Sequence, residues 1–261
     1  RNSTASFNTG VGFEALLNNT TGAEQVALGA QSLDANTTGS VNTAIGYAAL
    51  TDNTTGSSNV AVGKAALGDN TTASNNTAVG RDAMRLNTTG TQNVALGTFA
   101  LDANTTANNN TALGYFSLGS NTTGVQNVAV GASALLDCTT GNNNVAVGHL
   151  ALDDLTTGAT NVGVGLQAGE NITTGPSNVC VGNAAGDEIT TGNNNICIGN
   201  SSGVSASDAA LQYIIGANCS GTADFQITIG NDSVGKIQNS YNSNATWTRT
   251  SDVRYKKDIL D

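Results

Sequence analysis

A short apolar pattern recurs along the chain at one fixed spacing. It has the form of Thr43-Ala-Ile-Gly46, and the glycine that closes it is called the key glycine below. Every step between key glycines is 17 residues, and they fall at positions 12, 29, 46, 63, 80, 97, 114, 131, 148, 165, 182 and 199. A fixed short period of this kind predicts a solenoid, in which each repeat forms one coil and buries apolar side chains against the coils above and below.

The residues one and three before each key glycine face the same way in an extended strand. Val, Ile, Leu or Thr fills both positions from Thr9 to Ile198, whereas the residue between them is Ala, Gly or Cys. One face of each strand is therefore aliphatic, and the other must admit a close neighbour. That neighbour is either the axis of a multi-chain fibre or the opposite wall of a narrow coil.

Two further columns follow the key glycine, which we expect to have a positive φ. Leu, or Met84 in one coil, lies four residues later up to Leu152. Asn heads an Asn-Thr-Thr-Gly turn seven residues later, as at Asn53, where stacked amides can hydrogen-bond from coil to coil.

The two columns change together after Gly165. The Leu position becomes Gly169 and Gly186, while the Asn position holds Ile172 and Ile189. Volume lost in one column returns in the other, which predicts a core repacked at nearly constant volume. Because aliphatic residues can replace it, the Asn column is expected to face inward.

Composition agrees with stacked short strands. Aromatic residues make up 4% and charged residues 11% of the chain, too few large side chains for a compact globular core. The expected fold class is all-β, a parallel β-solenoid of 17-residue coils over residues 1–203. The spacing breaks down over residues 204–250, where Tyr213, Phe225 and Tyr241 appear, and we interpret this part as a β-rich cap or neck that covers the last open coil.

The net charge of −10 disfavours nucleic acid and anionic membranes as partners. No apolar run approaches the roughly 18 residues of a spanning helix, so membrane insertion is not expected, and no signal peptide opens the sequence. Acidic residues gather just before the Asn column. We interpret them as an exposed stripe that keeps the protein soluble; a calcium ladder is the alternative, but no coil offers the several converging oxygens that calcium demands.

Four cysteines, at positions 138, 180, 197 and 219, do not form a disulfide framework at this length. Cys180 and Cys197 share a column and are expected one coil apart. We interpret them as buried thiols in place of Ala, with a cross-link between subunits or a metal site as alternatives. The only histidine is His149 and no acid and base residues cluster outside the repeat, so we expect neither an enzyme nor a cofactor.

The last residues, Ser251-Asp-Val-Arg254-Tyr-Lys256-Lys-Asp-Ile259, resemble the start of the self-cleaving intramolecular chaperone of phage tail fibres and endosialidase tailspikes. In that family the chaperone brings three chains together and is cut off at this serine once the fibre has folded. The resemblance, over residues 251–261, implies Ser251 as the nucleophile and Lys256 as the base that accepts its proton. The rest of the chaperone is not in the sequence, so these residues alone are not expected to cleave.

The coils themselves, residues 2–203, are similar to the left-handed β-roll heads of YadA-type trimeric adhesins, whose repeats carry a comparable Asn-x-x-Ala-Ile-Gly string. The period of 17 is longer than is typical there. Asn2-Ser-Thr-Ala5 falls in the Asn-Thr-Thr-Gly column, so the sequence opens in mid-repeat and we expect more fibre or an attachment domain before it.

Together these features predict a structural and adhesive segment of a homotrimeric fibre, in a virion tail or on a cell surface. Its expected partners are two further copies of the chain and a host cell-surface receptor, either glycan or protein. The alternative is an ice-binding solenoid, since Thr pairs stacked about 4.8 Å apart could order water.

Overall fold

The computed structural model describes residues 5–241 and 248–250, and all of its regular elements are β-strands. The chain divides into two compact units, residues 1–143 and 144–261. Among the described residues, no helix is long and apolar enough to cross a membrane.

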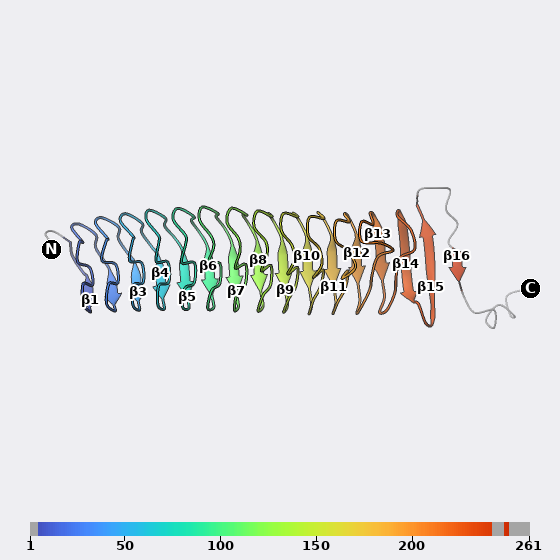
Figure 1. The fold of residues 1–261 in the computed structure, drawn as a ribbon, viewed down its shortest axis with the longest axis horizontal. Helices are drawn as coiled ribbons and strands as arrows, with labels where there is room; N and C mark the ends of the chain where they lie inside the picture. Colours follow the sequence, from blue (N-terminus) through green and yellow to red (C-terminus); the bar gives the residue numbers. More distant parts are fainter. Residues whose placement is uncertain (1–4, 242–247, 251–261) are drawn as a thin grey trace, which may run out of the picture. The chain divides into compact units, whose positions relative to one another are not determined.

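Unit 1 is a stack of three-residue parallel strands. Each strand pairs with the next at an offset of one repeat, so that Ala44 faces Ala61 and Ala61 faces Ala78 (Figure 1). The predicted parallel β-solenoid with 17-residue coils is confirmed. The strands are β1 (Thr9–Val11), β2 (Val26–Leu28), β3 (Thr43–Ile45), β4 (Val60–Val62), β5 (Thr77–Val79), β6 (Val94–Leu96), β7 (Thr111–Leu113) and β8 (Val128–Val130).

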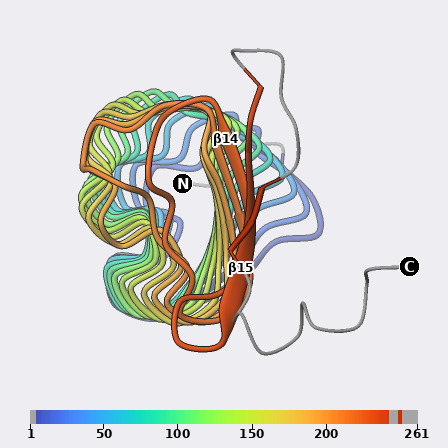
Figure 2. The same ribbon diagram turned by 90° about the vertical axis from the view of Figure 1, so that its right-hand side faces the viewer.

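Unit 2 has 17-residue coils of the same kind, and its strand pairing then changes. Parallel pairing extends past residue 203 to β14, and the pairs β14 with β15 and β15 with β16 are antiparallel. Figure 2 shows β14 and β15 side by side at the end of this unit. Its strands are β9 (Val145–Val147), β10 (Val162–Val164), β11 (Val179–Val181), β12 (Ile196–Ile198), β13 (Gln212–Ile215), β14 (Gln226–Asn231), β15 (Gly235–Ser240) and β16 (Thr248–Thr250).

The small residue in the middle of each strand points into the coil. Ala44 and Leu50 of the same coil are both fully buried. A Cβ added to Gly163, which takes the place of this Ala in β10, would lie 2.8 Å from Cγ of Leu152. The neighbour that limits this position to Ala, Gly or Cys is thus the opposite wall of a narrow coil, and the aliphatic residues on either side point outward.

The key glycine is required by the backbone. Gly63 has a φ of +137°, and a Cβ there would lie 2.4 Å from the carbonyl oxygen of Gly80 in the next coil. The predicted positive φ is confirmed. Sequence reasoning did not foresee that bulkier residues are also left-handed: Leu50, at the buried position four after the key glycine, has a φ of +51°.

Two ladders of buried amides run through unit 1. In the first, which the sequence predicted, Nδ2 of Asn53 donates to Oδ1 of Asn36 at 2.9 Å and to the carbonyl oxygen of Gly56 at 3.0 Å. The second was not predicted and lies four residues before the key glycine: the backbone N–H of Asn59 donates to Oδ1 of Asn42 at 3.0 Å, and Nδ2 of Asn42 donates to the same Gly56 carbonyl at 2.9 Å. Both ladders therefore meet on one inward carbonyl per coil.

The first ladder is replaced in unit 2 by the predicted exchange of volume. Ile172 and Ile189 are fully buried. A Cβ added to Gly169 would lie 3.0 Å from Cδ1 of Ile172, and one added to Gly186 would lie 3.2 Å from Cδ1 of Ile189. The isoleucine side chains thus reach over the glycines and fill the space that Leu holds in other coils, which confirms both the repacking and the inward position of this column.

Candidate functional site

The outward face of the strands, formed by the residues one and three before each key glycine, is here called the sheet face. Its side chains are half-buried in most coils and exposed in the others; Leu96 in unit 1 is 49% exposed and Ile198 in unit 2 is 39% exposed. No charged residue occupies these positions between Thr9 and Ile198. Each unit therefore presents an uncharged surface of Val, Ile, Leu and Thr side chains, and exposed apolar surfaces of this kind are typical of contact sites.

In the Asn-Thr-Thr-Gly turn the second threonine is exposed, and the first is half-buried from Thr37 onward. The first is used by the fold, since Oγ1 of Thr54 donates to the carbonyl oxygen of Thr71 in the next coil at 3.0 Å. The second forms an exposed column, and its members are Thr21, Thr38, Thr55, Thr72, Thr89, Thr106, Thr123 and Thr140 in unit 1 and Thr157, Thr174 and Thr191 in unit 2.

The acidic stripe contains half-buried and exposed carboxylates. Burial, followed by the negative charges of Asp69 and Asp34, raises the pKa of Asp52. Burial with a smaller contribution from Asp187 raises the pKa of Glu188 to about 7. Over the part of the chain that the structure describes, no three or more His, Cys, Asp and Glu side chains are grouped so that they could hold a metal ion.

The cysteines lie inside the coils. Cys180 and Cys197 are register partners in β11 and β12, as the sequence predicted, and all four thiols are free and buried. The hydrogen bond that the Cys197 thiol makes to its neighbour Cys180 and burial both raise the pKa of Cys197, and burial raises the pKa of Cys138 to about 11. Thiols held in the protonated form are poor nucleophiles, so these residues act as core side chains.

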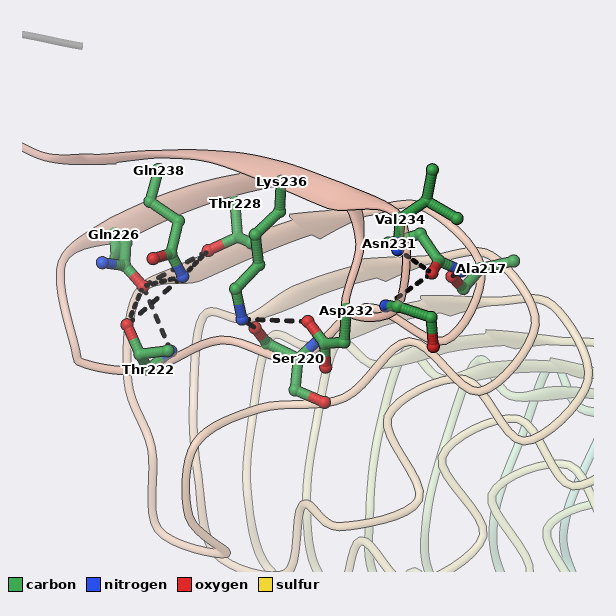
Figure 3. Close-up of polar contacts among 11 residues, drawn as sticks. Ala217, Ser220, Thr222, Gln226, Thr228, Asn231, Asp232, Val234, Lys236 and Gln238 are labelled. Atoms are coloured by element: carbon green, nitrogen blue, oxygen red, sulfur yellow. Dashed lines mark hydrogen bonds and ion pairs between the residues drawn. The ribbon is translucent and has the colours of Figure 1, made fainter. Parts of the chain in front are cut away.

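A polar cluster lies at the end of unit 2, around the β14–β15 hairpin (Figure 3). Nζ of Lys236 binds Oδ1 of Asp232 at 2.9 Å and the carbonyl oxygen of Ser220 at 3.0 Å, and this amine lowers the pKa of Asp232. Nearby, Oε1 of Gln226 accepts from the backbone N–H of Thr222 at 3.1 Å. These bonds hold the hairpin against the preceding coil at the point where the aliphatic core ends.

The predicted catalytic residues, Ser251 and Lys256, lie outside the described residues. His149 is exposed on the position directly after its key glycine. Sequence reasoning missed one group of surface residues in unit 1: Arg81, Phe99, Tyr115 and Phe116 stack on one another at a corner of the coils. The signal for them was present in the sequence, because large side chains stand at positions where some other coils have Ala, such as Ala30 and Ala65.

No protein-family model matches this sequence, and the searches of curated proteins and of solved structures found no match either.

Proposed function

We propose that the chain is a structural and adhesive segment of a homotrimeric fibre that projects from a virion tail or a cell surface and attaches to a host. The observation that carries the proposal is the sheet face. It carries Val, Ile, Leu or Thr in every coil and no charge, and its side chains are only half-buried in the single chain. Two further copies of the chain, related by a threefold axis along the coils, would cover this surface with identical surfaces.

The sheet face suits a self-contact for two physical reasons. Its side chains repeat at the spacing of the coils, so the same small contact is made again in every coil and the apolar area adds up along the stack. β-Branched residues such as Val60 and Val62 are stiff, so little side-chain entropy is lost when they pack. The small-residue column, by contrast, lies inside the coil and is not available for contact between chains.

Sedimentation equilibrium tests the assembly. A trimer has three times the chain mass of 26.1 kDa. Val60→Lys with Val62→Lys should dissociate it, because each chain brings two charges into a surface buried around the axis, whereas the same side chains are half exposed in a monomer and tolerate charge there. Thr55→Lys with Thr72→Lys, on the exposed turn, is the control and should leave the trimer intact. A folded wild-type monomer would refute the fibre.

The chaperone resemblance supports a maturation step in the same proposal. In a longer chain that carries the whole chaperone domain, Oγ of Ser251 would attack the carbonyl carbon of the peptide bond that is cut at this serine, and Lys256 would take the hydroxyl proton and pass it to the leaving amine. Water would then hydrolyse the ester formed on Ser251. Mass spectrometry of that longer chain, with Ser251→Ala and Lys256→Gln as variants, would test it. Uncut wild-type chain under conditions where the fibre folds would remove this step and leave the trimer proposal standing.

The exposed threonine column keeps ice binding as the second candidate. It presents one methyl and one hydroxyl per coil at a constant spacing of about 4.8 Å. Because the hydroxyl of the first threonine is engaged by the next coil, only a single rank remains free to order water. Ice-crystal shaping by the wild-type protein, lost in Thr55→Lys with Thr72→Lys, would favour this candidate over the fibre.

A further inference from the structure

One corner of unit 1 departs from the repeat. It lies just after the key glycine, at the positions one, two and five residues beyond it. We call this group the corner patch; its members are Lys64, Arg81, Arg85, Phe99, Tyr115 and Phe116.

Four members of the corner patch form a stack that runs along the coils. Cζ of Arg81 lies 4.6 Å from the centre of the Phe99 ring, and the Phe99 and Phe116 rings stack with centres 4.8 Å apart. Tyr115 meets Phe116 edge to face at 4.6 Å and is 55% exposed. The arrangement combines a guanidinium group, ring edges and one exposed tyrosine on a surface three coils long.

Packing of the solenoid does not require these side chains. The position of Arg81 and Tyr115 is filled by Ala30 in another coil of the same unit, and that of Phe99 by Ala65 with nearly the same backbone, φ of +52° against +58°. A left-handed conformation is unfavourable for a bulky residue such as Phe. Two adjacent coils nevertheless carry Phe there, on the outside, where neither fills the core.

The corner patch also holds the positive charge of unit 1. Among the described residues 5–143, the cationic side chains are Lys64, Arg81 and Arg85, on a chain whose net charge is −10. The carboxylates beside the arginines are too distant for direct hydrogen bonds, since Nε of Arg81 is 3.8 Å from Asp82 and Nε of Arg85 is 3.6 Å from Asp102. Both guanidinium groups are also partly exposed, which leaves their N–H donors open to an acidic ligand.

We propose that the corner patch binds an acidic oligosaccharide, with its carboxylate, sulfate or phosphate groups on Arg81 and Arg85 and the apolar C–H face of a sugar ring on Tyr115. The proposal rests on the proposed function and names the receptor chemistry that the fibre would recognise. Three coils span about 10–15 Å at a rise of about 4.8 Å, the length of two or three sugar rings. A protein partner is less suited, because a stable protein interface needs about 800 Å² on each side.

Calorimetric titration with oligogalacturonate, a carboxylate-bearing probe, and with heparin-derived oligosaccharide, a sulfate-bearing probe, tests the site. Wild-type protein should bind at least one of them, more weakly as salt rises, and should not bind neutral dextran. Phe99→Ala with Phe116→Ala, and separately Arg81→Ala with Arg85→Gly, should each lower affinity at least tenfold. These substitutions reproduce residues found at the same positions in other coils, so the fold is kept. Phe13→Ala, an exposed aromatic at the same position as Tyr115, is the matched control and should bind as wild type.

Three results would overturn the proposal. They are no binding of either acidic probe at millimolar concentration, equal binding of dextran, and binding that survives the alanine variants. Binding of serum albumin, an acidic protein, that is lost in the same variants while both saccharides fail would identify a protein-binding patch instead. Sedimentation of each variant separates this test from that of the fibre: a wild-type monomer that still binds the acidic probe would refute the trimer and leave the corner patch in place.

Discussion

The coil that begins at Gly46 in unit 1 and the coil that begins at Gly165 in unit 2 share a backbone and differ in their filling. Both key glycines have a φ of +136°, and the residue four positions later is left-handed in both, at +51° for Leu50 and +65° for Gly169. In the first coil the interior holds Leu50 and Asn53; in the second it holds Gly169 and Ile172. The backbone path is therefore set by hydrogen bonds and the key glycine, and more than one set of side chains can fill it.

The hydrogen bonds show which amide ladder is essential. In unit 1 the Gly56 carbonyl accepts from Asn53 at 3.0 Å and from Asn42 at 2.9 Å. In unit 2 the equivalent carbonyl of Gly175 accepts from Asn161 at 2.9 Å, and isoleucine has replaced the asparagine that would be the other donor. The ladder four residues before the key glycine is thus kept in both units, and the ladder of the Asn-Thr-Thr-Gly turn is exchangeable.

The largest effect is expected where the two coils are alike. Gly63→Ala in unit 1 and Gly182→Ala in unit 2 place a Cβ 2.4 Å and 2.5 Å, respectively, from a carbonyl oxygen of the next coil, at a φ near +137°. Backbone strain together with the forced displacement should lower the free energy of unfolding by about 4 kcal/mol or more in both units. Guanidinium unfolding would measure it. If the free energy of unfolding fell strongly for one variant and little for the other, the two units would not depend equally on the key glycine.

The next largest effect on stability depends on which side chains fill the interior of the coil. Ile172→Asn should lower the free energy of unfolding by about 2–4 kcal/mol, since it places an amide among aliphatic side chains and empties the space over Gly169. Asn87→Ile in unit 1 should cost less, about 1–2 kcal/mol, because the carbonyl of Gly90 keeps its bond from Asn76 at 2.8 Å. Thermal melts of the two variants compare them directly.

A second substitution makes that comparison sharper. Gly169→Leu alone should destabilise, because a Cβ there would lie 2.8 Å from Cδ2 of Leu152 and 3.0 Å from Cδ1 of Ile172. Added to Ile172→Asn it should recover part of the loss, and its positive φ is no obstacle because Leu50 adopts nearly the same conformation. A coupling of about 1 kcal/mol or more is expected. Strictly additive losses would mean that the two positions do not share one space.

A smaller difference in stability is expected between the two units at the ladder four residues before the key glycine, which both units keep. Asn161→Ala removes the asparagine amide that donates to the Gly175 carbonyl, whereas Asn59→Ala leaves the Ala73 carbonyl with its bond from Asn70 at 3.1 Å. The unit 2 variant should therefore lose about 1–2 kcal/mol more, the usual cost of a buried acceptor without a partner. Equal losses in urea unfolding would argue that water or a shift of the coil replaces the missing donor.

Much of this fold could be predicted from the sequence because the repeat is strict. The period fixed the register, and the paired change at Gly169 and Ile172 located both columns in the interior. Two features escaped. The left-handed conformation of Leu50 could not be expected, because leucine disfavours it. The hydrogen-bond ladder through Asn42 was not expected either, because this residue directly precedes the strand and was read together with it. The sequence also left open which face of each strand points into the coil, because period-two alternation distinguishes two faces without showing which one is inside.

The corner patch was not predicted from the sequence, for a different reason. In a repeat protein, the residue type common to most coils at a position reports on the fold. Residues that bind a ligand are those that differ from this common type. Arg81, Phe99 and Phe116 were visible in the sequence as separate exceptions. Only the coil geometry places residues 17 or 18 positions apart in direct contact.

The smallest expected effect is a pH dependence in the acidic stripe of unit 2. The Glu188 side chain lies over Gly203, where a Cβ would be 2.2 Å from its Oε2. Burial first and the neighbouring Asp187 second raise the pKa of Glu188 from its ordinary value of 4.5 to about 7, and the buried thiol of Cys197 also interacts with it. A raised pKa means that the folded protein holds this proton more tightly than the unfolded chain. The contribution is therefore fully present below pH 4.5 and is lost as the pH rises to about 7.

Urea unfolding of wild type and Glu188→Gln at pH 4.5 and pH 7.5 would measure this difference. Wild type should lose more stability between the two pH values than the variant, whose amide does not titrate. Glu170→Gln, one coil earlier, controls for the removal of one negative charge from the stripe. Because Glu188 is partly exposed, solvent screens its interaction with Asp187, and the effect should be the smallest of the series. An identical pH response in wild type and Glu188→Gln would show that the carboxyl ionises without strain, so that the stripe acts on solubility alone in unit 2.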